Sequence, residues 1–98
     1  METREIDHIR NTVSYYAKRY GAKRVYLFGS YARGDANENS DVDLRIDKGE
    51  IRGLQMAGLL LDLKDSLNKE VDLIPSSSLS ESFLNSIRSY EVLLYEAE

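Results

Sequence analysis

The chain has 98 residues, of which 42% are hydrophobic and 31% charged, and its net charge at pH 7 is -4. This length and composition predict one globular domain, residues 1–98, with a modest core. An acidic chain is unsuited to direct binding of nucleic acid, which needs basic side chains that release counterions. The absence of cysteine excludes disulfides and thiolate metal sites. The longest apolar or glycine run, residues 56–61, is too short to span a membrane, so we expect a cytoplasmic protein without a membrane partner.

The first predicted element is a helix that ends at Gly21, a residue type that often terminates helices. Its apolar stripe consists of Ile6, Ile9, Val13, Tyr16 and Tyr20. Residues 24–28 predict a buried strand, and a short helix over residues 30–33 is expected to follow the turn at Gly29. Residues 41–47 alternate, which predicts a strand. One face of that strand is expected to carry Asp41, Asp43, Arg45 and Asp47.

A longer helix is predicted over residues 51–68, opened by a capping box at Asp47 and Glu50. Residues 71–74 predict a third strand. A second capping box, at Ser78 and Glu81, is expected to open another helix. The inward side chains of that helix are predicted to be Leu79, Phe83, Ile87 and Tyr90. Residues 92–95 fit either a final strand or a continuation of the helix. This order predicts a small α/β fold of the α+β type, in which helices flank a mixed sheet.

The helix over residues 51–68 carries two apolar stripes on nearly opposite sides. One stripe consists of Met56, Leu60, Leu63 and Leu67, and the second of Leu54, Ala57, Gly58 and Leu61. A surface helix of a small domain usually buries only one face. Either other elements of this chain flank the helix on two sides, or the second stripe meets another chain.

The residues with the clearest chemistry begin at Gly29 and Ser30 and continue, after ten residues, with Asp41 and Asp43. Glycine permits a sharp turn and lets the backbone approach a phosphate closely. Ser30 offers a hydroxyl and an amide at the start of the short helix, where partial positive charge favours anionic oxygens. We therefore predict a phosphate-binding turn at Gly29 and Ser30.

Asp41 and Asp43 lie two apart on the predicted strand, so both carboxylates project from one face. A cation would relieve their repulsion, and Mg²⁺ favours oxygen ligands together with substrate phosphates. Asp72, on a neighbouring strand, would complete a site for two Mg²⁺ ions about 4 Å apart. Asp72 could also act as a general base toward an attacking hydroxyl. These three aspartates are the predicted metal ligands and catalytic residues for transfer of a nucleotide from a triphosphate to an acceptor.

Three further residues leave alternatives open, and a fourth is expected at the surface. Arg33, one turn after Ser30, either pairs with a phosphate or braces the loop against a carboxylate. Arg45 either moderates the repulsion between the aspartates, contacts a phosphate, or is an exposed strand residue. Tyr31 is either a core residue or a contact for a base. His8 lies off the apolar stripe of its helix and is expected at the surface.

With these residues identified, the chain resembles the minimal nucleotidyltransferase family, within the polymerase-beta-like nucleotidyltransferase superfamily. The family pattern is Gly-Ser, ten residues and Asp-x-Asp, and residues 29–43 match it without a gap. The fuller pattern is also intact, with Gly-Ser-x-Ala-Arg-Gly at residues 29–34 and Ser-Asp-x-Asp-Leu at residues 40–44. The later acidic strand of the family corresponds to residues 71–73. The resemblance covers essentially the whole chain.

The resemblance implies a nucleotidyltransferase fold, with Mg²⁺ at the aspartates and a nucleoside triphosphate, usually ATP, at the Gly-Ser turn. Larger relatives carry an extra domain that holds the acceptor, so here the acceptor is expected to come from a separate protein, in a hetero-oligomer. Free-standing members resemble antitoxins that are paired with a small helical HEPN ribonuclease toxin. The family activity is transfer of AMP to a tyrosine hydroxyl of that toxin, and this is the leading hypothesis.

Other hypotheses remain open. The acceptor could be a small molecule, such as an aminoglycoside, held by a second polypeptide. The chain could instead be a non-catalytic antitoxin that acts by binding its partner, or a free-standing nucleotide sensor. Three converging aspartates favour catalysis, because a pure binding protein has no need of them.

Overall fold

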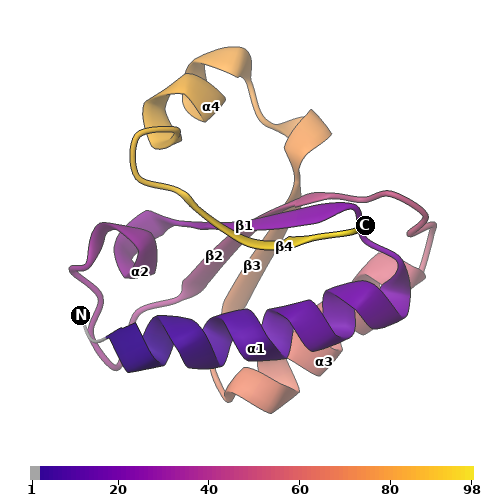
Figure 1. The fold of residues 1–98 in the computed structure, drawn as a ribbon, viewed down its shortest axis with the longest axis horizontal. Coiled ribbons are helices and arrows are strands. Elements are labelled where there is room, and N and C mark those ends of the chain that lie inside the picture. The colour runs from indigo at the N-terminus through magenta and orange to yellow at the C-terminus, as the bar shows by residue number, and fades with distance from the viewer. Residues whose placement is uncertain (1–2) are drawn as a thin grey trace.

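Alternation along β2 (Val42–Asp47) divides the molecule into an apolar and a polar side. In the computed structural model, which describes residues 3–98, the inward side chains of β2 have no exposed surface. They pack against α1 (Thr3–Tyr20) and α3 (Gln55–Leu67), which cover the same side of the sheet (Figure 1). The core between sheet and helices includes Ile9, Val13, Leu27, Leu44, Leu59 and Leu63.

The sheet has four strands in the order β3-β2-β1-β4. The strand β1 (Arg24–Phe28) is antiparallel to β2 and to β4 (Val92–Glu96), whereas β2 and β3 (Val71–Pro75) are parallel. A parallel pair needs a crossover connection, and α3 supplies it. The mixed sheet flanked by helices confirms the predicted fold class.

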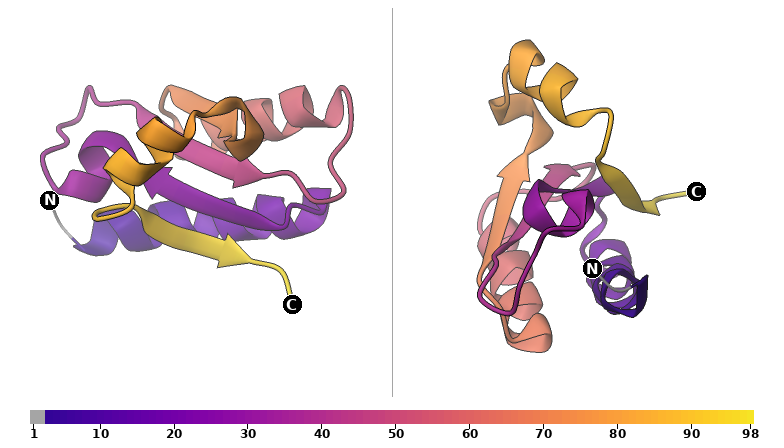
Figure 2. Two further views of the ribbon diagram at one scale, coloured as in Figure 1. Left: turned by 90° about the horizontal axis from the view of Figure 1, so that it is seen from above. Right: turned by 90° about the vertical axis from the view of Figure 1, so that its left-hand side faces the viewer.

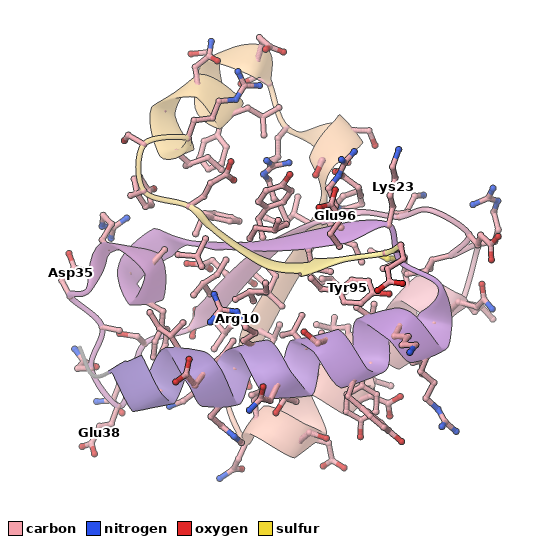
Figure 3. All side chains as sticks on the ribbon, viewed as in Figure 1. Arg10, Lys23, Asp35, Glu38, Tyr95 and Glu96 are labelled. Carbon is pink, nitrogen blue, oxygen red and sulfur yellow. The ribbon has the colours of Figure 1, made fainter. Side chains whose placement is uncertain are left out.

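Most of the predicted elements are confirmed. Gly21 ends α1 with a φ of 87°, and the short helix α2 (Gly29–Arg33) follows β1 directly. The ambiguous segment near the end of the sequence is the strand β4, because it pairs with β1. Figure 3 shows Glu96 of β4 on the side of α4 (Glu81–Ile87) and Tyr95 on the side of α1. Among residues 3–98, no helix combines the length and the apolar character needed to cross a membrane.

The predicted capping box at Asp47 and Glu50 is wrong. Asp47 ends β2, and its Oδ2 accepts a hydrogen bond from Nε of Arg24 at 2.9 Å. Gly49 and Gly53 follow with φ values of 60° and 54°, which are turn conformations rather than helical ones. The helix α3 therefore begins only at Gln55.

The second capping box is displaced by two residues, since Ser80, rather than Ser78, caps α4. Its hydroxyl accepts a hydrogen bond from the backbone N–H of Phe83 at 3.0 Å. Of the four side chains predicted to point inward here, Ile87 is buried, whereas Phe83 is 37% exposed. The reason is the position of α4, which lies over the polar side of the sheet, away from α1 and α3 (Figures 1 and 2).

The first apolar stripe of α3 packs into the core, together with Leu59, which the prediction had omitted. Most of the second stripe is uncovered by the described part of the chain, since Leu54 is 89% and Leu61 65% exposed, although Gly58 is half-buried beside Tyr20. The interpretation in which this chain flanks α3 on both sides is therefore wrong. Contact of the second stripe with another chain stays a prediction.

Candidate active site

The site begins with one row of residues on the polar side of the sheet, which we call the carboxylate row: Phe28, Asp43 and Asp72. Asp43 is paired with Phe28 of β1 on one side and with Asp72 of β3 on the other. Because residues directly opposite each other in a sheet share a face, the two carboxylates project in the same direction. The predicted convergence of Asp43 and Asp72 follows from this register.

The predicted phosphate-binding turn meets the carboxylate row at Gly29. This residue has a φ of 73° and begins α2. A β-carbon at Gly29 would lie 2.9 Å from Cγ of Asp43 and closer still to its Oδ2. The Asp43 carboxylate thus occupies the space of a side chain at this position, so only glycine fits without displacement. The half-buried Ser30 follows immediately.

Asp43 has a perturbed acidity. Burial raises the pKa of its carboxyl to about 6, assisted by a hydrogen bond with Asp72 and by the negative charges of Asp72 and Asp41. The charge of Arg33 acts in the opposite direction. Burial and neighbouring negative charge therefore both disfavour the ionised form of the Asp43 carboxyl.

Asp41 precedes β2 and is exposed. Within residues 3–98, no three histidine, cysteine, aspartate or glutamate side chains form a preassembled metal site. Asp43 and Asp72 adjoin each other, and Asp41 would have to turn toward them. The donor set still fits Mg²⁺, because it consists of oxygen ligands alone and because a cation would offset the repulsion between the neighbouring carboxylates.

Arg33 braces the loop that follows α2. Its Nε lies 3.4 Å from Oδ2 of Asp35, which projects outward at the tip of this loop (Figure 3), and its guanidinium lies 5.6 Å from the centre of the Tyr90 ring. The side chain is 47% exposed. Because its charge lowers the pKa of Asp43, Arg33 is also near enough to act on an anion bound beside Asp43.

Arg45 differs from all of its predicted roles. It is 9% exposed, its guanidinium lies 3.7 Å from the centre of the Tyr26 ring, and it forms two hydrogen bonds with Glu91. Glu91 is 46 residues away, so no local sequence pattern could reveal the pair. Tyr31 is 1% exposed and belongs to the core, which rules out contact with a base, and His8 is exposed as expected.

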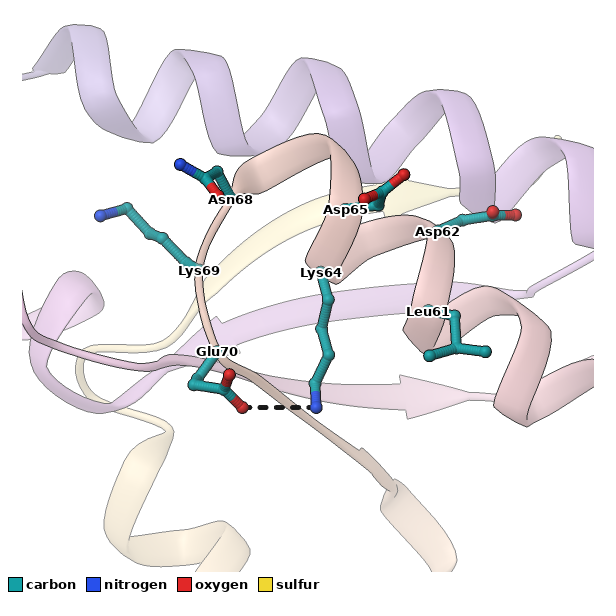
Figure 4. Close-up of a pocket in the computed structure, with 7 residues that line it drawn as sticks. All are labelled: Leu61, Asp62, Lys64, Asp65, Asn68, Lys69 and Glu70. Atoms are coloured by element: carbon teal, nitrogen blue, oxygen red, sulfur yellow. Dashed lines mark ion pairs between the residues drawn. The ribbon is translucent and has the colours of Figure 1, made fainter.

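A hollow of about 530 Å³ opens at the C-terminal end of α3 (Figure 4). Its lining consists of Leu61, Asp62, Lys64, Asp65, Asn68, Lys69 and Glu70. An ion pair of 3.3 Å between Lys64 and Glu70 crosses it. None of the predicted site residues lines this hollow, so its volume has no bearing on the carboxylate row.

Comparison with known proteins agrees with this geometry. A family model described as "Polymerase beta, Nucleotidyltransferase" matches residues 11–98. Protein adenylyltransferase MntA of Thermococcus cleftensis is 38% identical over 71 residues, which are 71% of this chain and 72% of that protein.

Solved structures show the same fold. A "putative minimal nucleotidyltransferase" is 33% identical, with a TM-score of 0.79 over 94% of this chain and 95% of that one. The complex of a tri-AMPylated Shewanella oneidensis HEPN toxin with its MNT antitoxin gives a TM-score of 0.67 at 20% identity, covering 91% of this chain and 71% of that one, a likeness of fold alone. The family match and the sequence identity to the adenylyltransferase decide the matter: this chain belongs to the polymerase beta nucleotidyltransferase family.

Proposed function

We propose that this chain is a Mg²⁺-dependent protein adenylyltransferase that acts as an antitoxin. In this proposal, residues 1–98 form a single domain that transfers AMP from ATP to a tyrosine hydroxyl of a partner HEPN toxin, in the cytoplasm. The observation that carries the proposal is the contact between Gly29 and Asp43, which sets a phosphate-binding turn directly against the carboxylate row. The protein adenylyltransferase of Thermococcus cleftensis and the AMPylated HEPN toxin in the Shewanella complex support the choice of AMP and of the acceptor.

The triphosphate is held at the turn. Ser30 donates hydrogen bonds to phosphate oxygens from its hydroxyl and its backbone N–H, while the bare backbone at Gly29 allows close approach. Arg33 adds a positive charge that remains half exposed. The result is an α-phosphate beside Asp43, where the acceptor can reach it.

Asp41, Asp43 and Asp72 are the proposed metal ligands, for two ions. When bound, Mg²⁺ neutralises phosphate charge and steadies the attacking and leaving oxygens. Asp72, which is exposed, accepts the proton of the acceptor hydroxyl. The hydroxyl oxygen then forms a bond to the α-phosphorus, and the bond from this phosphorus to the departing pyrophosphate breaks. The protein contributes mainly positioning and electrostatic stabilisation.

The decisive experiment is the intact mass of the partner protein after incubation with this chain, ATP and Mg²⁺. We expect the partner to gain whole AMP units with the wild type and none with Asp43→Asn. Asp47→Asn serves as a matched control, because Asp47 lies on the same face of the same strand but is paired with Arg24. The control should retain transfer.

Other outcomes would identify the alternatives. A partner that binds tightly and stays unmodified would contradict AMP transfer and favour inhibition by contact alone. Consumption of ATP without a change in protein mass would favour a small-molecule acceptor held by the second chain.

A further inference from the structure

The polar side of the sheet has a second row of residues next to the carboxylate row. Here Tyr26 is paired with Arg45, and Arg45 with Ile74. The guanidinium of Arg45 stacks on the Tyr26 ring at 3.7 Å from its centre. A nearly buried cation therefore lies two residues along β2 from Asp43.

The hydrogen bonds of Arg45 reach both ends of one segment, residues 76–91, which we call the α4 arm. Its Nε and Nη2 donate to Oε1 and Oε2 of Glu91 at 2.8 and 3.0 Å. Its Nη1 donates to Oγ of Ser76 at 3.0 Å. Ser76 leaves β3 and Glu91 leads into β4, so a single side chain of β2 clamps the arm where it starts and where it ends.

The α4 arm in turn contacts the phosphate-binding turn. Phe83 packs edge-on against Phe28, the residue before Gly29, with ring centres 5.7 Å apart. Tyr90 lies under the guanidinium of Arg33. Within α4 itself only Ile87 is buried, and the helix stands away from the sheet (Figure 2). The placement of the arm therefore depends strongly on its clamped ends.

We propose that Arg45 is a positioning residue for the nucleotide. By clamping both ends of the α4 arm to β2, it keeps Phe83 and Tyr90 against the phosphate-binding turn and so sets the affinity for MgATP. In this proposal Arg45 does not itself contact the nucleotide, because Glu91 neutralises its charge and the Tyr26 ring covers one face of its guanidinium. The inference rests on the proposed function in naming MgATP as the ligand.

The test measures two quantities in the wild type and in Arg45→Met. The first is the affinity for MgATP, by calorimetry, and the second is the rate of amide hydrogen exchange in residues 76–91. If the arm is docked in about a tenth of the variant molecules, the apparent Kd rises about tenfold. Exchange should accelerate in the arm more than in β1 and β2. Arg45→Lys should have a Kd and an exchange rate between those of the wild type and of Arg45→Met. An ammonium group cannot form the bidentate ion pair with Glu91 and also stack on the Tyr26 ring.

Arg24→Met is the matched control. Arg24 lies on the same side of the sheet and pairs with Asp47 and Glu96, which lie outside the arm. Asp47 also lies 3.8 Å from Arg45, and Arg24→Met leaves that contact in place. It should lower the melting temperature and leave both the Kd for MgATP and the exchange of the arm unchanged. If Arg45→Met does not fold, the double variant Arg45→Met with Glu91→Met takes its place, since it leaves no unpaired buried charge.

Wild-type affinity and wild-type exchange in Arg45→Met would overturn the inference. An equal loss of affinity in Arg24→Met would also overturn it, because general destabilisation would then be the cause. If the wild type itself binds no MgATP, the proposed function has failed, and exchange of the arm alone decides whether Arg45 clamps it.

Discussion

Asp43 fills the space that a side chain at Gly29 would need. A β-carbon there would lie 2.9 Å from Cγ of Asp43, and the φ of 73° independently disfavours every residue with a side chain. An ordinary Gly-Ser turn needs only conformational freedom. This one also needs empty space, because a carboxylate from the neighbouring strand lies against it.

Replacing Gly29 with alanine should therefore damage both stability and activity. We expect a loss of roughly 1–3 kcal/mol in the free energy of unfolding, the usual cost of a strained backbone conformation. Transfer of AMP should fall by about 100-fold, because displacement of Asp43 misaligns the reacting groups. Denaturant titration and single-turnover transfer measure the two effects.

Gly53→Ala separates backbone strain from collision. Gly53 also has a positive φ, of 54°, but a β-carbon there would meet nothing within 4 Å. It should lose stability and retain transfer. If Gly29→Ala loses stability and retains transfer as Gly53→Ala does, the contact of Gly29 with Asp43 does not contribute to AMP transfer.

The raised pKa of Asp43 predicts a specific pH dependence of stability. Folding raises this pKa from the ordinary value of 3.8 to about 6, so between these pH values the folded state holds more protons than the unfolded state. The contribution of Asp43 is thus most favourable at low pH and is lost as the pH rises toward 6. Asp43 is half exposed, so solvent screening limits the effect to roughly 1 kcal/mol.

This contribution is measured as the difference between wild type and Asp43→Asn in the free energy of unfolding, from pH 4 to pH 7 without divalent cations. The subtraction is needed because Asp47, whose pKa is lowered by hydrogen bonds from Ser76 and Arg24, contributes with the opposite sign. Asp43→Asn should be the more stable protein at pH 7. A difference that does not vary with pH would refute the raised pKa of Asp43.

Mg²⁺ should stabilise the wild type more than Asp43→Asn. A ligand that binds only the folded state raises its stability, and the wild type has the complete carboxylate set. We expect a larger increase in melting temperature with Mg²⁺ in the wild type than in Asp43→Asn at pH 7. Equal shifts in the two proteins would contradict metal binding at Asp43.

The sequence predicted what depends on local pattern. The face of β2 that carries Asp43 follows from alternation, and the turn at Gly29 follows from glycine chemistry. The register that sets Asp43 beside Asp72 is not local, because it depends on the parallel pairing of β2 with β3. The contacts of Arg45 could not be predicted from the sequence, because Glu91 and Ser76 approach it only after β3 and the α4 arm have folded back. For the same reason periodicity placed Phe83 in a core, although α4 lies over a polar side of the sheet.

The second stripe of α3 provides a last prediction. Leu61 is 65% exposed, so Leu61→Glu should change the free energy of unfolding by less than about 0.5 kcal/mol. Leu63, two residues further along α3 and in the core, is 1% exposed, and Leu63→Ala should cost about 2–5 kcal/mol. If the stripe meets the acceptor protein, Leu61→Glu weakens the complex in a binding titration although the isolated chain stays folded. A complex of unchanged affinity would place the interface on another surface.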